Sequence, residues 1–403
     1  MKDKTLNIAV YSGVIPSSVF IENLISGISD KYCIQLFGKR NHDYKAYKKR
    51  RKEEKKCILF YSISDHRTIN FIVALYRFLL LWIKFPKRGI QLLTELKKHK
   101  GIKSKYIWTV RYLPVLLNIP DIFHIQWAKE LKYWFFLKEK FNVKIIVSLR
   151  GAHINYSPLV DLDLAQSYRL LFPKVDAFHA VSKAIGDNAK LYGADTNKIH
   201  VIHSPISEKV LESFSIKIKK SGTKLNIISI GRFHWKKGFQ DALLAISDLI
   251  KKNFNISYTI IATNKPSENF LYMRHILGLD AVVKVKPSLP HDILLKELKD
   301  YDILLLPSYE EGIANVVLES MSVGLPVISS DCGGMNEVVN DGVNGFVFRT
   351  GNVEDLSKKI EQISKMTEGE LQTIVEKAHQ TISKDFNSKD VNELFINLYK
   401  SVL

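Results

Sequence analysis

The chain has few cysteines, and none of them lies in a recognisable structural pattern. Cys33, Cys57 and Cys332 are far apart in the sequence and form no CxxC pair. This spacing argues against a disulfide framework and against a thiolate metal site, and it suits a reducing cytosol. The sequence therefore predicts a cytoplasmic protein with neither a disulfide framework nor a thiolate metal site.

Long apolar runs and a leader segment are also lacking. No uninterrupted apolar stretch reaches the length of about 18 residues that a membrane-spanning helix needs. The segment that comes nearest, FIVALYRFLLLWIKF, contains Arg77 and Lys84. The first residues, MKDKTLNIAVYSG, lead directly into a strand pattern, so we expect no signal peptide. With 403 residues, 46% of them hydrophobic, the chain is long enough for two ordinary domains.

Acidic residues are scarce in the first part of the chain. Residues 1–150 contain 30 Lys and Arg against 11 Asp and Glu, whereas residues 201–403 contain 24 against 25. The formal net charge of +18 therefore arises in the first 150 residues. Such asymmetry indicates two domains in different surroundings. The first domain is expected to face an anionic partner.

Short apolar runs separated by helical segments predict a parallel sheet in each half of the chain. The first strand is followed by a loop with Gly13 and Pro16, residues 39–56 form a charge run typical of a solvated loop or helix end, and residues 67–118 are helical in period. The predicted strands are 6–12, 32–38, 121–127, 143–151, 177–182 and 199–204, then 225–233, 257–263, 281–286, 302–308, 325–330 and 345–348.

These two series predict an α/β fold of two doubly wound, Rossmann-like domains. We expect an N-terminal domain at 1–205, a linker at 206–224, a C-terminal domain at 225–386, and a last helix at 387–403 that returns to the N-terminal domain. Ligands of open parallel sheets bind beyond the carboxyl ends of the strands. The cleft between the domains is therefore the expected site.

Two basic residues follow the first strand of the second domain. In ISIGRFHWKKGFQDALLAI, Arg232 and Lys237 lie between the strand and the next helix. Beside helix-terminal N–H groups, an Arg fork and a Lys point charge hold a diphosphate well. A solvated basic loop is the alternative, because the chain has neither a GxGxxG fingerprint nor a P-loop.

Two glutamates flank the start of a later helix, which the sequence predicts to begin near Asn315 and to stop at Gly324 and Pro326. Glu311 lies in the loop before it, and Glu319 lies on its second turn, eight positions on. At about 1.5 Å per residue they are roughly 12 Å apart, farther than the pair of about 5 to 10 Å that a glycosidase uses. Such a separation suits the two hydroxyl-rich rings of a nucleotide sugar, with its diphosphate between them. Ordinary helix charges are the alternative.

In this context the sequence resembles the GT-B glycosyltransferases, specifically the family-4 type that retains anomeric configuration. The likeness rests on Glu311…Glu319, on LESMSVGLPVISSDCGGMNEVVNDGVNGFVF after it and on GRFHWKKG before it, across about residues 225–350. The resemblance implies two domains around a cleft, a nucleotide diphosphate sugar as donor, and a glycan or lipid-linked hydroxyl acceptor in bacterial polysaccharide biosynthesis. It implies no metal and no other cofactor.

The resemblance also implies roles for residues of the second domain. Glu319 would bind the ribose hydroxyls, Glu311 would lie beside the donor sugar, and Leu289 would contact the base. Arg232 and Lys237 would hold the diphosphate and stabilise its charge as it leaves. The backbone beneath the donor would come from Gly312, Ile313, Ala314, Asn315 and Val316.

The first domain departs more from the family pattern. Of the glycine-rich loop after the first strand only Gly13 remains, which we assign to donor binding. In SLRGAH, Arg150 stands at the position of the family's histidine, Gly151 matches, and His153 follows. Arg150 would stabilise the leaving phosphate and His153 would bond the sugar, although a local structural role for His153 is the alternative. His124 in DIFHIQW, at a strand end, is mainly a structural residue, with contact to the acceptor as the alternative.

The implied reaction breaks the anomeric C–O bond, and a departing phosphate oxygen takes the acceptor proton. No Asp-x-Asp lies at a strand end, since the triplet Asp161-Leu162-Asp163 follows a proline in a loop-like stretch. A nucleotide-sugar epimerase or phosphorylase of similar architecture is the alternative enzyme. A nucleic-acid-binding protein is disfavoured, because the basic half has no RNP-like, zinc-finger or helix-turn-helix pattern.

The basic half also predicts salt-sensitive, peripheral association with the inner face of an anionic membrane. Its helical segment interleaves apolar and basic residues, as a helix does that faces both lipid and anionic headgroups. The alternative is that the apolar residues pack in the core and the cations are only solvated. The residues concerned are Phe71, Ile72, Leu75, Phe78, Leu79, Trp82 and Phe85, with Arg77, Lys84, Lys87, Arg88, Lys97 and Lys98.

Overall fold

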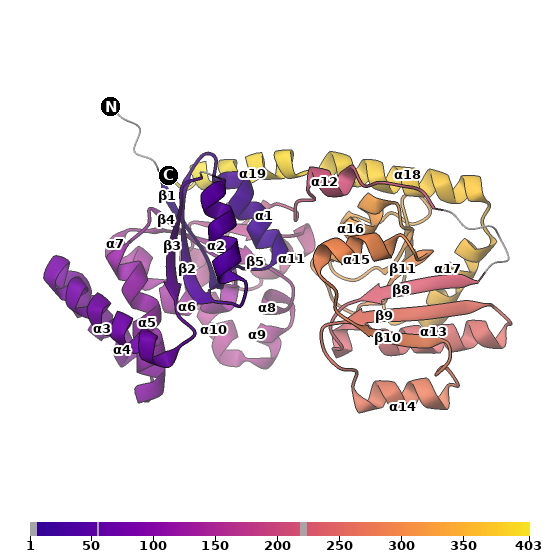
Figure 1. Cartoon of the computed structure of the whole chain (residues 1–403), viewed down its shortest axis with the longest axis horizontal. Helices are drawn as coiled ribbons and strands as arrows, with labels where there is room; N and C mark the ends of the chain where they lie inside the picture. Colours follow the sequence, from indigo (N-terminus) through magenta and orange to yellow (C-terminus); the bar gives the residue numbers. More distant parts are fainter. Residues whose placement is uncertain (1–5, 55, 218–223) are drawn as a thin grey trace.

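The computed structural model describes residues 6–54, 56–217 and 224–403. Within these residues the chain forms two parallel sheets, of seven and six strands, each covered by helices on both faces (Figure 1). The predicted fold class, two doubly wound α/β domains, is confirmed. Each predicted strand is present, although one strand of the first sheet was not predicted.

The N-terminal sheet has the strand order β3-β2-β1-β4-β5-β6-β7. Its strands are β1 Asn7–Ile15, β2 Cys33–Arg40, β3 Ile58–Ile63, β4 Ile122–Ile125, β5 Lys144–Leu149, β6 Ala177–Ala180 and β7 Ile199–Val201. The helices are α1 Val19–Ile28, α2 Tyr44–Glu53, α3 Arg67–Lys84, α4 Pro86–Lys97, α5 Ile102–Leu117, α6 Leu131–Trp134, α7 Phe136–Phe141, α8 Ala152–Asn155, α9 Ser157–Val160, α10 Leu162–Leu171 and α11 Lys183–Lys190.

The C-terminal sheet has the strand order β10-β9-β8-β11-β12-β13. Its strands are β8 Leu225–Ile230, β9 Ile256–Ala262, β10 Val283–Pro287, β11 Ile303–Leu306, β12 Val327–Ser330 and β13 Phe346–Phe348. The helices are α13 Phe239–Lys251, α14 Glu268–Ile276, α15 His291–Leu298, α16 Asn315–Val323, α17 Val353–Lys365, α18 Glu368–Asp385 and α19 Ser388–Lys400.

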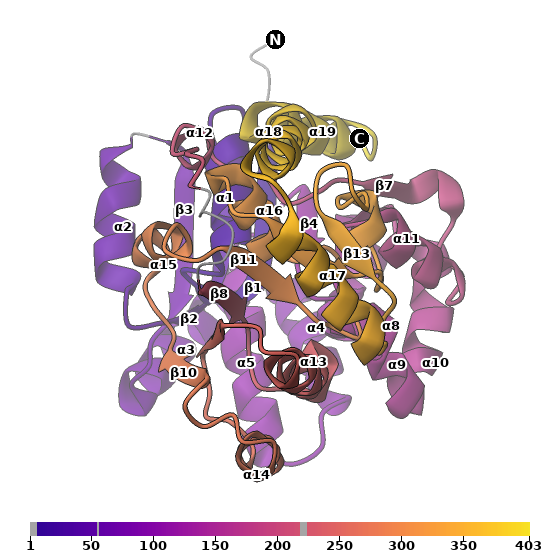
Figure 2. The same ribbon diagram turned by 90° about the vertical axis from the view of Figure 1, so that its right-hand side faces the viewer.

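The alternation of side chains along the central strands builds two cores per sheet. In β1, Ala9 and Tyr11 belong to the core beneath α5, whereas Ile8 and Val10 belong to the core on the opposite face. That second core also contains Tyr399 and its neighbours from α19, the last helix of the chain. Figures 1 and 2 show α18 and α19 running along one edge of both domains.

The predicted domain boundaries stay a prediction. Between β7 and β8 the chain forms the short helix α12 (Glu208–Leu211). Residues 218–223 of the predicted linker lie outside the described residues. No helix in the described part of the chain is both long and apolar enough to cross a membrane.

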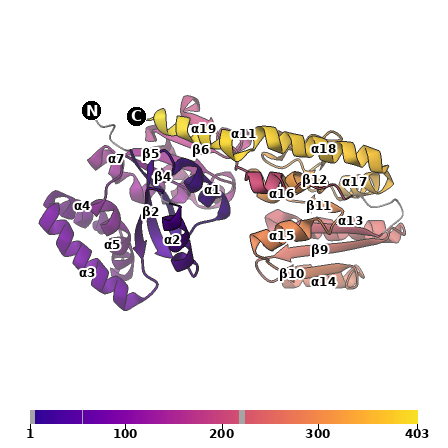
Figure 3. The ribbon, with the colours of Figure 1, turned by 45° about the horizontal axis from the view of Figure 1, so that its top comes forward.

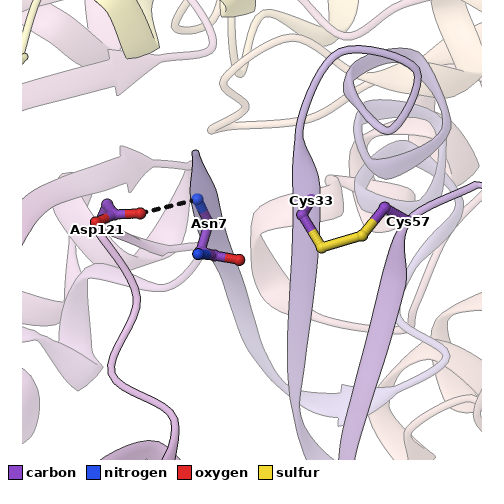
Figure 4. The surroundings of a disulfide bond; sticks show 4 residues. All are labelled: Asn7, Cys33, Cys57 and Asp121. Atoms are coloured by element: carbon purple, nitrogen blue, oxygen red, sulfur yellow. Dashed lines mark hydrogen bonds between the residues drawn. A yellow bond between two sulfur atoms is a disulfide. The ribbon is translucent and has the colours of Figure 1, made fainter. Parts of the chain in front are cut away.

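The prediction of no disulfide was wrong. Cys33 and Cys57 form a disulfide between the starts of β2 and β3 (Figure 4). The register of this parallel pair sets Ile34 opposite Ile58, which leaves the two cysteines side by side with Cα atoms 4.7 Å apart. Cysteine spacing therefore gives no support for the reducing compartment that we inferred from it.

Two local predictions were also wrong. Gly13 lies inside β1, which runs on to Ile15, because a register shift against β2 absorbs it without ending the strand. The charge run at 39–56 is largely the helix α2. Arg51 of this helix is only 4% exposed, and its guanidinium bonds the carboxylates of Glu22 and Glu54, both at 3.0 Å.

Candidate functional site

The loop after β11 carries the first glutamate, and the helix after it carries the second. β11 ends at Leu306, and α16 begins at Asn315, where the sequence predicted it. Glu311 therefore lies in the loop and Glu319 on the second turn of the helix. α16 ends before Gly324, so one carboxylate lies before this helix and the other lies on it.

The loop after β8 packs directly against this loop. It contains a turn of 3-10 helix at Trp235–Lys237, after which Gly238 takes a φ of 61°. A Cβ at Gly238 would overlap the backbone carbonyl of Pro307, so only glycine permits this approach. The close contact brings the Lys237 Nζ to 2.5 Å from the Glu311 Oε1. Arg232 of the same loop is exposed and has no carboxylate partner within the described residues.

Glu311 is buried among cations and hydroxyls. Its Oε1 also accepts a hydrogen bond from the Ser308 hydroxyl at 3.0 Å, and the Lys236 Nζ lies 3.9 Å from its Oε2. Burial alone would raise the pKa of Glu311. The charges of Lys237 and Lys236 and the hydrogen bonds from Lys237 and Ser308 outweigh burial and hold this pKa below its ordinary value. The group is therefore an ionised carboxylate at neutral pH.

Glu319 lines a cavity of about 600 Å³. Its Oε1 lies 2.9 Å from the Nε2 of His291, the first residue of α15. The hydrogen bond and the charge of Glu319 raise the pKa of His291, although burial opposes this rise. Other walls of the cavity include Phe20 of α1 and Asn315 of α16, so both domains contribute to it.

Arg150 comes from the opposite domain, directly after β5. Its Nη2 donates to the Gln126 Oε1 at 3.0 Å, and its guanidinium lies over the Phe20 ring, 4.3 Å from the centroid. Burial lowers the pKa of Arg150 to about 9, so it is cationic at neutral pH. Within the described residues it has no carboxylate partner, and its Nε has no hydrogen-bond partner.

His153 lies near this arginine, in α8. Burial and the nearby charge of Lys129 lower its pKa to about 4, so the imidazole is neutral. Its ring lies 5.3 Å from that of Trp127, and its Nδ1 is buried with no hydrogen-bond partner among the described residues.

The two domains meet at the loop that carries Glu311. A Cβ at Gly312 would lie 2.8 Å from the Val181 side chain and 3.7 Å from the backbone N of Gly151. The Asn155 side chain of α8 donates to the Glu310 Oε1 across the same boundary. These contacts set the Glu311 loop beside the loop of Arg150 and His153, as the two-domain cleft requires.

A carboxylate of the C-terminal domain also caps a helix of the N-terminal domain. The two oxygens of Glu337 accept hydrogen bonds from the backbone N–H groups of Lys183 and Ala184, at 2.8 and 3.0 Å. Both belong to the first turn of α11, where an anion is favoured by the helix dipole. This contact joins the two domains, which lie side by side in Figure 3.

His124 is bound in a buried network, in agreement with the structural role that we predicted. The Nε2 of His179 lies 2.9 Å from the carbonyl of Ile202, so this nitrogen carries the proton and Nδ1 accepts from Ser148. The Ser148 oxygen then accepts from the His124 Nε2, and the His124 Nδ1 accepts from the Tyr399 hydroxyl at 2.8 Å. Burial, with the charge of Arg150, lowers the pKa of His124 to about 3 and keeps it neutral.

The structure does not bring every predicted site residue together. Glu311 and Lys237 are in contact, and the Gly312–Val316 backbone continues from Glu311 into α16. Leu289 lies two residues before His291 and packs against the core that contains Met321 and its neighbours. Gly13 lines a separate cavity of the N-terminal domain, beside Tyr11 and Gly38.

Sequence reasoning missed four polar residues of this region. They are Lys236, Glu310, His291 and Gln126. Lys236 and Glu310 are sequence neighbours of predicted site residues, so their places in the two strand-end loops were a usable signal. His291 and Gln126 gave no such signal, because their partners lie 28 and 24 residues away.

Metal ligands are not grouped in this region. Among the described residues, no cluster of three or more His, Cys, Asp or Glu side chains is arranged to hold a metal ion. Asp161 of the Asp-x-Asp triplet instead caps α10, where its side chain accepts from the backbone N–H of Leu164 at 3.0 Å.

Comparison with known protein families assigns the C-terminal half. Residues 212–381 match the family described as "Glycosyl transferases group 1". These residues are therefore similar to a group 1 glycosyltransferase domain. Glu311, Glu319, Lys237 and Arg232 lie within the matched residues, whereas Arg150 lies outside them.

Curated relatives are glycosyltransferases named for polysaccharide biosynthesis. The provisionally assigned colanic acid biosynthesis glycosyltransferase WcaL of Salmonella typhimurium is 24% identical over 64% of this chain and 63% of its own length. The amylovoran biosynthesis glycosyltransferase AmsK of Erwinia amylovora is 26% identical over 60% of each. The chain thus spans less than two thirds of the length of these relatives.

Solved structures match the whole of the chain. Anabaena HepE, crystallised with UDP, has a TM-score of 0.70 and 16% identity, and the match covers 99% of this chain and 100% of that one. The matching structures are GT-B glycosyltransferases, so the protein has the GT-B fold.

Proposed function

We propose that the protein is a retaining glycosyltransferase of the family-4 type. It transfers a sugar from a nucleotide diphosphate sugar to a hydroxyl group of a glycan or a lipid-linked acceptor. The GT-B fold, the group 1 domain and the names of the relatives support this reaction class. HepE, the Anabaena protein with the same fold, has been crystallised with UDP and with UDP-glucose, which supports a nucleotide-sugar donor.

The observation that carries the proposal is the uncompensated cation at Arg150. A partly buried guanidinium without an acidic partner is costly, and an anionic ligand relieves this cost. Arg150 contacts Phe20, which forms one wall of the cavity that contains Glu319. The donor nitrogen Nε of Arg150 has no protein partner within the described residues. A diphosphate at this position would supply both the missing charge and the missing acceptor.

The carboxylates would hold the two ends of the donor. Glu319 uses Oε1 for His291, which leaves Oε2 to accept from ribose hydroxyls in the cavity. Glu311 would accept from the donor sugar, with the Gly312–Val316 backbone beneath it. His153 would bond the sugar from the other domain, and Leu289 would contact the base. Gly13 lines a different cavity, so the proposed donor site does not include it.

The cations would stabilise the leaving group. As the anomeric C–O bond breaks, positive charge develops on the ring and negative charge on the diphosphate. Lys237, Arg232 and Arg150 would stabilise this anion as fixed charges, which is the part that a metal ion plays in other transferases. The acceptor oxygen would attack from the face that the diphosphate leaves, and a phosphate oxygen would take its proton. This arrangement needs no metal and no nucleophile from the protein.

We place this reaction in bacterial polysaccharide biosynthesis at the inner face of the cell membrane. The names of WcaL and AmsK, for colanic acid and amylovoran, support the pathway class. The basic N-terminal domain supports a site next to an anionic surface.

A thermal-shift series tests the donor proposal. A ligand that binds only the folded protein raises its melting temperature, by about 2.7 kcal/mol of stability at 100 times its Kd. We expect UDP or another nucleoside diphosphate to raise the melting temperature of wild type, and Arg150→Gln to reduce this shift sharply. Arg169→Gln, at an exposed arginine of α10, is the matched control. An equal shift in both variants would contradict the role of Arg150.

A further inference from the structure

The helix α3 exposes a continuous apolar stripe. Its residues recur at intervals of three and four, which places them on one face of the helix. Several are exposed by half or more of their surface, with Ile72 at 66% and Ile83 at 79%. The stripe consists of Ile69, Ile72, Tyr76, Leu79 and Ile83, flanked by Phe71 and Leu75.

The opposite face of α3 fills the protein core. Ala74 and Leu81 are buried, and Phe78 packs against the same core cluster. The helix is therefore apolar on two faces, of which the fold covers one. Of the seven apolar residues that sequence analysis singled out, four are exposed, which removes the interpretation that all of them pack in the core.

The helices α4 and α5, which neighbour α3, also expose apolar residues. α3 packs against both of them, and Ile90 and Leu93 of α4 and Ile102 of α5 are also exposed. Figures 1 and 3 show α3 and α4 at the end of the N-terminal domain, on the side away from the C-terminal domain. We call the exposed apolar residues of α3, α4 and α5 the α3–α5 face. A soluble monomer rarely exposes so many large apolar side chains together without a partner.

The charges around the α3–α5 face all have one sign. Residues 66–118 contain 11 Lys and Arg and a single acidic residue, Glu95. Glu95 is 4% exposed, and Lys98 and Gln91 bond its carboxylate. Exposed lysines border the apolar residues, among them Lys84 beside Ile83 and Lys87 before Ile90. A partner of this face must therefore be apolar at its centre and anionic at its border.

We propose that the α3–α5 face docks on an anionic lipid bilayer. The apolar stripe would enter the boundary between headgroups and acyl chains, and the lysines would contact the headgroups. The proposal rests on the proposed function in one respect: docking would hold the transferase beside a lipid-linked acceptor. A second copy of the chain fits less well, because a symmetric contact through this face would bring the lysines of both copies together. Nucleic acid fits less well, because the exposed stripe is mainly aliphatic and offers few aromatic rings on which bases could stack.

Flotation of the full chain with vesicles tests the apolar part of this face. The vesicles are phosphatidylcholine alone or phosphatidylcholine with phosphatidylglycerol, at low and at physiological salt. We expect wild type to float with the anionic vesicles only, and Ile72→Ser with Leu79→Ser to weaken binding roughly tenfold or more, because each loses a large apolar side chain. Val160→Ser with Leu162→Ser is the matched control, at side chains 82% and 77% exposed elsewhere in the domain.

The lysines are tested in the same assay. Each cation near an anionic surface contributes about 1 kcal/mol, so Lys84→Gln with Lys87→Gln should weaken binding at low salt by roughly 30-fold. Lys251→Gln with Lys265→Gln removes two exposed lysines of the C-terminal domain and should leave binding unchanged. Equal flotation with neutral and anionic vesicles, or test variants that match their controls, would overturn the proposal.

Two further measurements test whether the α3–α5 face binds a second copy of the chain or nucleic acid instead. A concentration-dependent dimer that Ile72→Ser with Leu79→Ser abolishes, in a chain that binds no vesicles, would assign the face to a second copy and overturn the proposal. Salt-sensitive binding of a duplex oligonucleotide without vesicle binding would overturn it as well. The shift of melting temperature with UDP is measured on the same samples. If UDP does not shift the melting temperature of wild type, this result counts against the proposed donor. The flotation result tests the α3–α5 face alone.

Discussion

Replacement of Lys237 by alanine separates two roles that this side chain has in the structure. Its Nζ lies 2.5 Å from the Glu311 Oε1, and the side chains are only 15% and 11% exposed. The lysine therefore neutralises a buried carboxylate. In the proposed reaction the same lysine also stabilises the departing diphosphate.

The stability change follows from what remains around Glu311. Removal of one partner of a buried ion pair costs about 3–5 kcal/mol, because the other charge is left unpaired. Ser308 at 3.0 Å and Lys236 at 3.9 Å still contact the carboxylate, so we expect a smaller loss. An expected loss of about 2–3 kcal/mol would lower the melting temperature by roughly 4–12 °C for a domain of this size.

The change in turnover follows from the leaving-group role. A fixed donor aimed at charge that develops in the transition state contributes about a hundredfold to a thousandfold in kcat. We expect Lys237→Ala to lose this factor in release of nucleoside diphosphate from a nucleotide sugar, measured below its melting temperature. Lys252→Ala is the control, since that exposed lysine pairs with Asp248 at 2.7 Å in the same domain.

A second variant distinguishes the two roles. Lys237→Ala combined with Glu311→Gln has no unpaired carboxylate, so we expect most of the lost stability to return. Turnover should stay low, because the diphosphate still lacks its cation and the donor sugar lacks the Glu311 carboxylate. If Lys237→Ala kept near wild-type turnover while its melting temperature fell, the lysine would serve Glu311 alone and the reasoning would be refuted.

Three other outcomes follow from the contacts. Glu319→Ala should weaken binding of free nucleoside diphosphate in calorimetry, whereas Glu311→Ala should mainly lower turnover; equal losses of affinity would show that the carboxylates do not divide the ligand. Because the folded-state pKa of His291 is raised, its contribution to stability is present below its unfolded pKa and is lost as pH rises through the folded value. Wild type should therefore exceed His291→Gln in free energy of unfolding by more at pH 5.5 than at pH 8.5, and a constant difference would contradict the Glu319 pair. Tyr399→Phe leaves the buried His124 Nδ1 without its donor, so urea unfolding should show a loss of about 1–3 kcal/mol, and no loss would contradict the assigned network.

Local patterns in the sequence predicted the elements that carry the site. The run DILLLPS predicted β11, and the apolar spacing from Asn315 with the stop at Gly324 predicted α16. Both signals depend only on neighbours in the chain. For the same reason the places of Glu311 and Glu319, one in the loop and one on the second turn, could be predicted.

Contacts between distant segments could not be predicted in this way. The bond from His291 to Glu319 depends on how α15 packs beside α16, and the Cys33–Cys57 disulfide depends on the pairing of β2 with β3. The short run ILFYSI follows a charge run and gave too weak a signal for a strand. Helical period likewise identified the apolar positions of α3, but it does not say which of two apolar faces the fold covers.

The anomeric configuration of the product tests the central claim most directly. Nucleotide diphosphate sugars labelled with ¹³C at the anomeric carbon are incubated with the full chain and alkyl glycosides as hydroxyl acceptors, and the product is read by NMR. We predict release of nucleoside diphosphate and a new glycoside with the configuration of the donor, both lost in Glu311→Ala. An inverted glycoside, or an epimerised or phosphorolysed sugar without transfer, would contradict a retaining glycosyltransferase.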